Sequence, residues 1–527
     1  MTLTSLPFYL LVLALLVLYY LVPKRFQWVV LLIGSYAFYA FVCLRYMGFI
    51  VVTTLTTYFG ARGMDAMTAR MEQTVAAHKQ DWEREERKAY KKRCKSRRKA
   101  LMIAILLLNF GILAVLKYYN FFAESMETLF ASVGLTVSLG HIGLLLPLGI
   151  SFYTFQSMGY LLDVYNGKYA PQKNMAWFAL FVSFFPQLIQ GPIGRYDQLE
   201  KQLESGGHVN VPRAFLLMLW GLFKKMVVAD RALVAVRAVF DAPGGTWGGA
   251  MAVVGVLAYS VQQYCDFSGG IDLVAGIAEL FGIRLAENFR RPYFAVSLGD
   301  FWRRWHISLG AWMRDYVFYP FALCKPVARL SKAAKGRFGA AFARALPAAL
   351  GNILVFTLVG VWHGATSNYI LWGLYNGVIL ALTALLEPRV KRMNERCPRL
   401  TGSRGFHVFR VLRTFIIVNI GWFFDRCATA GDAVRMMGSI LTTPCLEQVS
   451  LVNLGLSPLD ARILAAGVLL LFIVSLLGES GRDVRGWLAA RALPIRWAVM
   501  IGAAVVILLT GVWGSGFSEA SFIYFNF

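Results

Sequence analysis

The chain has few histidines, six among 527 residues, and few acidic residues, 29 against 53 lysines and arginines. Its seven cysteines form no CxxC pair and no spacing typical of metal ligands. We therefore expect no metal centre and no disulfide framework, with Cys427 and Cys445 the one pair to test. Patterns for a serine nucleophile elbow, an HExxH zinc helix, a phosphate-binding loop and a dinucleotide-binding turn are also missing.

Long hydrophilic stretches are equally scarce, since 57% of the residues are hydrophobic and the mean hydropathy is +0.56. This composition excludes a soluble globular protein and a disordered one. Apolar runs close to the length needed to cross ~30 Å of hydrocarbon recur along the chain. We predict an all-α polytopic membrane protein with about 11–13 transmembrane or re-entrant helices around a central funnel or tunnel. The apolar segments are 7–22, 26–43, 47–60, 101–116, 142–162, 177–193, 214–228, 250–264, 347–362, 369–386, 408–424, 463–477 and 497–512.

The net charge of +24 is concentrated in three segments beside apolar runs. Residues 79–99 carry +7, residues 325–344 carry +6 and residues 387–413 carry +6. Short basic loops mark the cytoplasmic side of membrane proteins, so we place all three in the cytoplasm and both chain termini outside. A nucleic-acid partner is not expected, because the charges flank membrane spans and lack a binding fold.

We interpret residues 1–527 as a single membrane domain. Residues 70–100 form its cytoplasmic basic segment and residues 425–460 an extracytoplasmic linker. The region 264–320 differs from the rest, because Asp266, Gly269 and Gly270 interrupt an apolar run and arginines follow among aromatic residues. Non-helical backbone at membrane depth must be buried in protein or face water, so we expect a funnel or a re-entrant core here.

Two histidines lie in apolar surroundings rich in tryptophan and glycine, 57 residues apart. His306 follows Trp305, and His363 follows Trp362 inside a long apolar run. A polar residue held at membrane depth is a functional-site hypothesis by default. A buried neutral imidazole can act as a general base toward a hydroxyl group. The alternative is a structural histidine satisfied by a backbone carbonyl.

Together these residues resemble the membrane-bound O-acyltransferase family. Residues 300–309, DFWRRWHISL, are similar to that family's Trp-x-Arg-Trp-His signature, and residues 361–365, VWHGA, to its catalytic-histidine motif. Residues 184–193, 264–270 and 521–527 match the family as well. Within it the chain looks most like the branch of alginate O-acetylation proteins and related bacterial exopolysaccharide acetylation proteins. A basic insertion at 323–344 departs from that branch and leaves the polymer open.

The resemblance implies an enzyme of a bacterial cytoplasmic membrane that binds no cofactor. An acyl thioester, acetyl-CoA first, would be the cytoplasmic donor. The acyl group would pass through a tunnel to a hydroxyl of a cell-surface polysaccharide, or to an extracytoplasmic acetyltransferase partner. His363 and His306 would be catalytic, with His306 nearer the donor, and membrane lipid would surround the protein. The implied substrate- and donor-binding residues are Gln187, Asp266, Trp302, Arg303, Arg304, Asp315 and Trp362.

Other interpretations stay open. Trp302, Arg303, Arg304 and Trp305 could be interfacial anchors instead of site residues. The whole chain could be a polysaccharide or lipid transporter without chemistry, or a scaffold that recruits a secreted enzyme. A transporter built from paired halves would show internal repeats, and none is visible. Within the family, D-alanyl transfer to teichoic acid is a further alternative.

Overall fold

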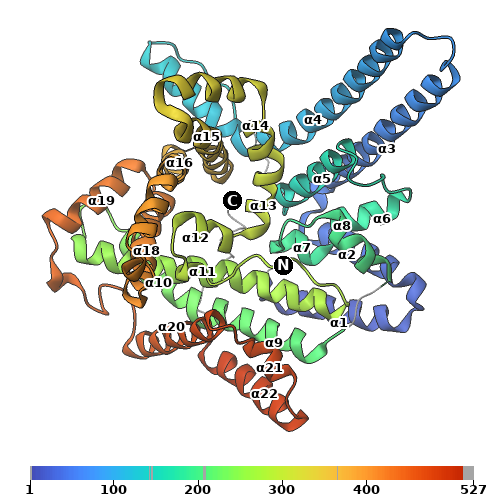
Figure 1. Ribbon diagram of the computed structural model, residues 1–527. Coiled ribbons are helices and arrows are strands. Elements are labelled where there is room, and N and C mark those ends of the chain that lie inside the picture. Colours follow the sequence, from blue (N-terminus) through green and yellow to red (C-terminus); the bar gives the residue numbers. More distant parts are fainter. Residues whose placement is uncertain (1–2, 142, 144–145, 206–208, 365, 514–527) are drawn as a thin grey trace. The chain divides into compact units, whose positions relative to one another are not determined.

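A computed structural model describes residues 3–141, 143, 146–205, 209–364 and 366–513 of the chain (Figure 1). It is 81% helical, and the residues it describes form no β-strand, which confirms the all-α class. The predicted family motif at 521–527 lies outside the described residues.

Seven helical segments among the described residues are long and apolar enough to cross a membrane, which establishes a multi-pass membrane protein. One of them, Lys24–Ala77, contains two of the predicted apolar runs, and two shorter apolar helices lie at Leu6–Leu21 and Met175–Gln190. The count of 11–13, which included re-entrant helices, stays a prediction. The other candidates are Arg84–Ser132, Lys325–His363, Ser367–Arg396, Arg404–Arg426, Pro458–Glu479 and Leu493–Thr510.

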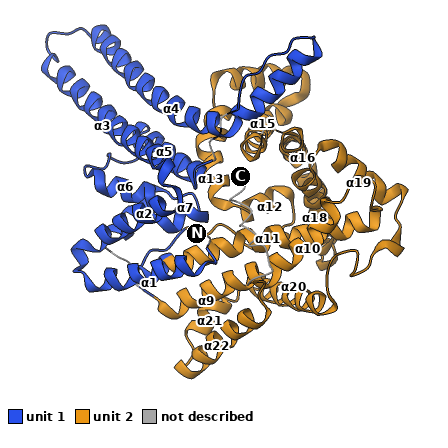
Figure 2. Ribbon diagram, turned by 180° about the vertical axis from the view of Figure 1, so that it is seen from behind, with its two compact units in different colours: residues 1–209, 278–285 blue, residues 210–277, 286–527 orange. Residues whose placement is uncertain are grey.

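The described chain divides into two compact units (Figure 2). Unit 1 comprises residues 1–209 and 278–285, and unit 2 comprises residues 210–277 and 286–527. The helices of unit 1 are α1 (Leu6–Leu21), α2 (Gln27–Cys43), α3 (Met47–Ala77), α4 (Arg84–Ser132), α5 (Ile150–Tyr165), α6 (Met175–Ser183), α7 (Phe185–Gln190) and α8 (Tyr196–Ser205).

The basic segment of unit 1 is a helical hairpin. Helix α3 continues past its apolar part to Ala77, and α4 begins at Arg84, so the two form the long helical pair of Figure 1. A capping box in which Glu83 and Glu86 satisfy each other's backbone amides starts α4. Most side chains between the two apolar parts are exposed. The basic segment is therefore a solvent-exposed helical hairpin, while its cytoplasmic location stays a prediction.

Unit 2 contains the remaining helices. Two π-helical turns interrupt it, at Phe223–Ala229 after α9 and at Arg314–Phe318 after α13. The helices are α9 (Val211–Leu222), α10 (Asp230–Phe240), α11 (Gly249–Leu280, its last turn in unit 1), α12 (Leu298–Arg304), α13 (Ile307–Met313), α14 (Tyr319–Ala322), α15 (Lys325–His363), α16 (Ser367–Arg396), α17 (Pro398–Thr401), α18 (Arg404–Arg426), α19 (Ala430–Thr442), α20 (Pro458–Glu479), α21 (Val484–Ala489) and α22 (Leu493–Thr510).

The predicted break at residues 264–270 is wrong, because α11 runs through it as one helix. The acid that suggested a break is neutralised inside the protein: Asp266 Oδ1 lies 2.6 Å from Lys225 Nζ. Gly269 provides a close approach, since a Cβ there would lie 2.8 Å from the carbonyl oxygen of Gly221 on α9. The acid and the glycine therefore mark a tight helix interface.

Helices α15 and α16 form a hairpin, and their close packing positions the end of α15. A Cβ at Gly360 would lie 2.4 Å from the Tyr369 carbonyl oxygen, and one at Gly373 would lie 2.4 Å from that of Phe356. Small residues let helix backbones pack closely in a membrane, where burial of apolar surface gives little driving force. His363 is the last residue of α15 and lies at the closed end of this hairpin.

Candidate functional site

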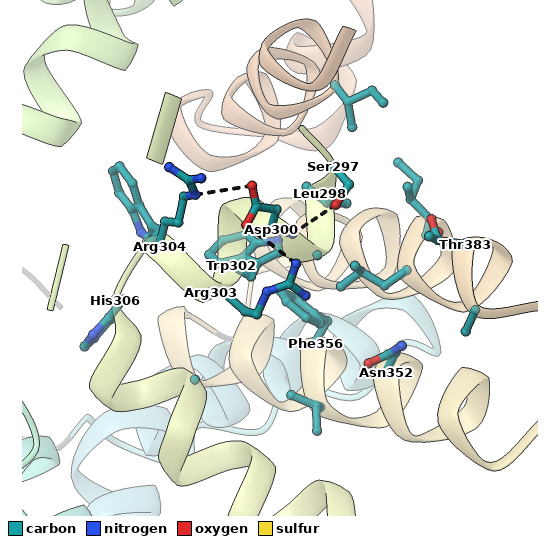
Figure 3. A pocket seen from close by; sticks show the side chains of 18 of the residues that line it. Ser297, Leu298, Asp300, Trp302, Arg303, Arg304, His306, Asn352, Phe356 and Thr383 are labelled. Atoms are coloured by element: carbon teal, nitrogen blue, oxygen red, sulfur yellow. Dashed lines mark hydrogen bonds and ion pairs between the residues drawn. The ribbon is translucent and has the colours of Figure 1, made fainter. Parts of the chain in front are cut away.

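One cavity of about 1460 Å³ lies within unit 2, and both candidate histidines line it. Its wall comes from α11, α12, α13, α15, α16, α18 and the end of α20. Figure 3 shows Trp302, Arg303 and Arg304 approaching it from α12, and Asn352 and Phe356 from α15. A cavity is thus present beside part of the region 264–320, formed by the short helices and loops that follow α11 rather than by a re-entrant α11.

His306 is positioned by a strand-like pairing of two loops. Phe289 and Trp305 form an isolated antiparallel bridge, and the amide of Ile307 donates to the Asn288 carbonyl at 3.0 Å. His306 itself has φ +46° and ψ +53°, a left-handed conformation that costs a residue with a side chain about 1–2 kcal/mol. Such strain persists only where the surrounding structure fixes it, and it is common at functional sites.

Asn288 also fixes the tautomer of His306. Its Oδ1 accepts from the amide of Ser308 at 3.0 Å, and since an amide only donates, the atom facing it is the oxygen. His306 Nδ1 lies 3.2 Å from the same oxygen, so Nδ1 carries the proton and Nε2 the lone pair. The Phe267 ring packs edge-on at 4.9 Å. Between α12 and α13, outside the candidate spans, burial lowers the pKa of His306 to about 3. The imidazole is therefore neutral at physiological pH.

His363 stands in an aromatic enclosure. Its ring stacks on Tyr369 at 5.9 Å and meets the edge of Trp372 at 5.1 Å. The ring of Trp362 lies edge-on, 5.0 Å from that of His363. Asn368 ties the start of α16 to the end of α18 by donating to the carbonyl oxygens of Phe424 and Cys427. His363 is half-buried and lines the cavity, as a group that meets a bound substrate must.

The arginines of α12 form an ion-pair cluster on the cavity wall. Asp300 Oδ2 lies 3.2 Å from Arg304 Nε, and Asp300 Oδ1 lies 3.5 Å from Arg303 Nη2, as the dashed lines of Figure 3 trace. Arg304 Nη1 also lies 2.7 Å from Glu479 Oε1. Eight basic side chains line the cavity against four acidic ones, which favours an anionic ligand. The basic residues are Arg290, Arg291, Arg303, Arg304, Arg314, Lys391, Arg410 and Arg413.

The cavity follows α16 over most of its length. Lining residues on this helix run from Trp372 to Asn394, a rise of about 33 Å at 1.5 Å per residue. That is close to the ~30 Å of a bilayer's hydrocarbon core. At one end of this stretch the cavity is lined by His363 and the aromatic Trp372. At the other end it is lined by the basic Lys391.

Trp302, Arg303, Arg304, His306 and His363 are brought together by this cavity. The indole of Trp302 donates to Asn376 at 3.2 Å, and Trp305 is buried among aromatic rings, while both residues line the cavity. Neither packing resembles that of a lipid-facing anchor. Their catalytic or binding roles stay predictions.

Four other predicted site residues do not line the cavity. Gln187 is buried in unit 1, where its side chain donates to the Pro192 carbonyl at 3.3 Å and supports the short helix α7. Asp266 pairs with Lys225, and Asp315 with its neighbour Arg314 at 3.0 Å. Trp362 is buried, with its ring 5.0 Å from that of His363.

Sequence reasoning missed four groups of the site. Asn288 lies 18 residues before His306 and Glu479 lies 175 residues after Arg304, and no local pattern marks either of them. Gln263 and Asp425 line the cavity from long apolar helices. A polar side chain inside an apolar run was the available signal for Gln263, whereas Asp425 directly follows the apolar run 408–424.

Comparison with known proteins places this site in a family. A model of the membrane-bound O-acyltransferase family matches residues 170–419, which include both histidines. The chain is 32% identical over 428 residues to a probable alginate O-acetylase, AlgI, of Pseudomonas syringae pv. tomato, covering 81% of this chain and 72% of that protein. The chain belongs to the membrane-bound O-acyltransferase family. It is accordingly an O-acyltransferase.

Other members of the family differ in the polymer that their names specify. The chain is 29% identical over 464 residues to a peptidoglycan O-acetyltransferase of Helicobacter pylori, covering 82% of this chain and 76% of that protein. It is 26% identical over 285 residues to a teichoic acid D-alanyltransferase of Bacillus subtilis, covering 52% and 67%. Membership of the family thus establishes the reaction, acyl transfer, but does not identify the acceptor polymer.

Proposed function

We propose that this O-acyltransferase moves an acetyl group from a cytoplasmic acyl thioester, acetyl-CoA, across the bacterial cytoplasmic membrane. The acceptor is a hydroxyl on a cell-surface polysaccharide, reached directly or through an extracytoplasmic transferase. The names of the relatives support a polymer acceptor, since alginate and peptidoglycan are both extracytoplasmic polysaccharides.

One observation carries this proposal: a single cavity reaches both His363 and the basic segment 387–413. The positive-inside rule places that segment in the cytoplasm. The lining of α16 spans about the thickness of the hydrocarbon core, so the cavity is long enough to connect the two sides. A donor entering at Lys391, Arg410 and Arg413 would thus meet an acceptor near His363.

The two histidines then take different roles. His363 would remove the proton of the acceptor hydroxyl as that oxygen attacks the thioester carbonyl, and the thiolate would leave with the carrier. His306, neutral and with its Nδ1 proton held by Asn288, would accept or relay a hydrogen bond through Nε2. A base with a pKa near 3 is too weak to deprotonate a hydroxyl at pH 7, which favours His363 as the base.

The test uses purified protein in liposomes with an external oligosaccharide acceptor. Acetyl-, butyryl- and palmitoyl-CoA are supplied on the side of the basic segments, and acylated product is measured on the other side. We expect acetyl-CoA to turn over fastest. Faster use of palmitoyl-CoA would move the chain to a lipid-modifying role. Transport of oligosaccharide without acylation would contradict the proposal.

A further inference from the structure

Two arginines from different segments converge on one carboxylate oxygen at the cavity wall. Arg291 Nε lies 2.6 Å and Arg304 Nη1 lies 2.7 Å from Oε1 of Glu479, the last residue of α20. All three line the cavity, and the Glu479 side chain is 26% exposed. The carboxylate can therefore be replaced by a ligand without opening the protein core.

The Arg304 guanidinium has an anchor besides Glu479, and the backbone of Arg291 is fixed at a turn. Arg304 Nε also pairs with Asp300 at 3.2 Å, and Asp300 is in turn fixed by the backbone amide of Val296 at 3.2 Å. Arg291 has φ +46°, a conformation set by the turn that begins at Pro292. Oxygen–nitrogen distances of about 2.7–2.9 Å are those of charge-assisted bonds from arginine to either carboxylate or phosphate. The pair of arginines is thus an anion site already formed.

We propose that Glu479 occupies the place of the phosphate of the acyl donor, and that the donor displaces it. This inference rests on the proposed function. The ligand is the 4′-phosphate of phosphopantetheine, which coenzyme A and acyl carrier proteins share. On binding, Arg291 and Arg304 exchange the Glu479 carboxylate for phosphate oxygens, and Glu479 turns toward water. Glu479 thereby selects against thioesters without phosphate, because only a donor that carries negative charge at this place competes with the carboxylate.

The test compares two donors that differ by a single phosphate, S-acetyl-4′-phosphopantetheine and S-acetyl-pantetheine. The readout is the ratio of KM for the phosphate-free donor to KM for the phosphorylated one. In Glu479→Gln the competing charge is gone while the shape is kept, so we expect this ratio to rise about three- to tenfold, through a lower KM for the phosphorylated donor. In Arg304→Lys and Arg291→Lys, which lose the planar fork, we expect it to fall toward one.

Glu387→Gln is the matched control, because Glu387 is another carboxylate of the same cavity wall. If Glu387→Gln raises the KM ratio as much as Glu479→Gln does, the change in ratio comes from the overall charge of the cavity. The proposed displacement of Glu479 would then be wrong. An unchanged ratio in a folded Glu479→Gln protein would overturn the inference and leave the proposed function intact. If the wild-type protein uses neither thioester, the proposed donor itself is wrong. Acetyl-CoA and an acetylated carrier protein, run as two further arms, distinguish the sources of the phosphate.

Discussion

Asn288 holds His306 through one oxygen atom, which faces the imidazole Nδ1 at 3.2 Å. Because the same oxygen also accepts from the amide and the hydroxyl of Ser308, it is fixed on three sides. The relationship determines where the proton of His306 sits, and it joins a loop before α12 to the first turn of α13.

The first prediction concerns stability against pH. Burial lowers the pKa of His306 from 6.5 to about 3, so the folded protein holds it neutral while the unfolded chain protonates it. This contribution to stability is complete above pH 6.5 and is lost as the pH falls toward 3. We expect the melting temperature of wild-type protein to fall more steeply from pH 7 to pH 5 than that of His306→Asn.

The exposed His407 of α18 serves as the control for that experiment. His407→Asn should keep the wild-type slope, whatever its absolute melting temperature. Equal slopes in wild type and His306→Asn would mean that His306 is not buried as a neutral ring.

The second prediction concerns His363. His363→Ala should lower the rate of acyl transfer by about 10²–10⁴-fold, the usual cost of losing a general base. Expression and melting temperature should stay close to those of wild type, because the ring is half-buried at a helix end. The measurement is acetylated product per mole of purified protein, with His407→Ala alongside. Retained acetylation by a folded His363→Ala protein would refute the assignment.

The third prediction concerns the close packing of α15 and α16. A Cβ at Gly373 meets the Phe356 carbonyl oxygen at 2.4 Å, whereas one at Gly336 on α15 meets nothing within 4 Å. Gly373→Val should therefore destabilise the protein by about 1–3 kcal/mol and displace His363, lowering activity further than Gly336→Val. Thermal inactivation in detergent measures the loss of stability. The loss of activity is measured as kcat, with each variant assayed about 20 °C below its own melting temperature. Tolerance of valine at position 373 would mean that the helices do not approach this closely.

The fourth prediction concerns topology. A cysteine placed at Tyr90 in a cysteine-free background should react with a membrane-impermeant maleimide only after the cells are permeabilised, because residues 79–99 carry +7. A cysteine at Ser450, in the segment expected outside, should react in intact cells. Labelling of position 90 without permeabilisation would reverse the orientation and, with it, the side from which the donor enters.

Local sequence predicted the apolar helices well, because hydrophobic length is a property of each segment alone. The run 26–43, for example, is α2 at Gln27–Cys43, and the run 463–477 lies inside α20. The prediction failed at 264–270, where glycine and acid suggested a break. Asp266 is compatible with a helix only because Lys225 lies beside it, and that pairing depends on tertiary structure.

The residues of the site also fall into those that local sequence reveals and those that depend on tertiary structure. Both histidines and the α12 arginines could be found because each stands out from its immediate neighbours. Glu479 could not, since it is an ordinary acid at a helix end, 175 residues from Arg304. Gln187 and Asp266 stood out equally, yet they form internal bonds away from the cavity.

Helix α16 is the hairpin partner of α15, the helix that ends at His363. Because α16 is a single continuous helix, its cavity-lining ends are kept about 33 Å apart in every state in which the helix is intact. Under the proposed function, two large molecules would therefore be held at once, a carrier at one end and a polymer at the other, and neither would have to enter the other's compartment. The membrane would then stay sealed to both, and the small acyl group would be all that has to cross.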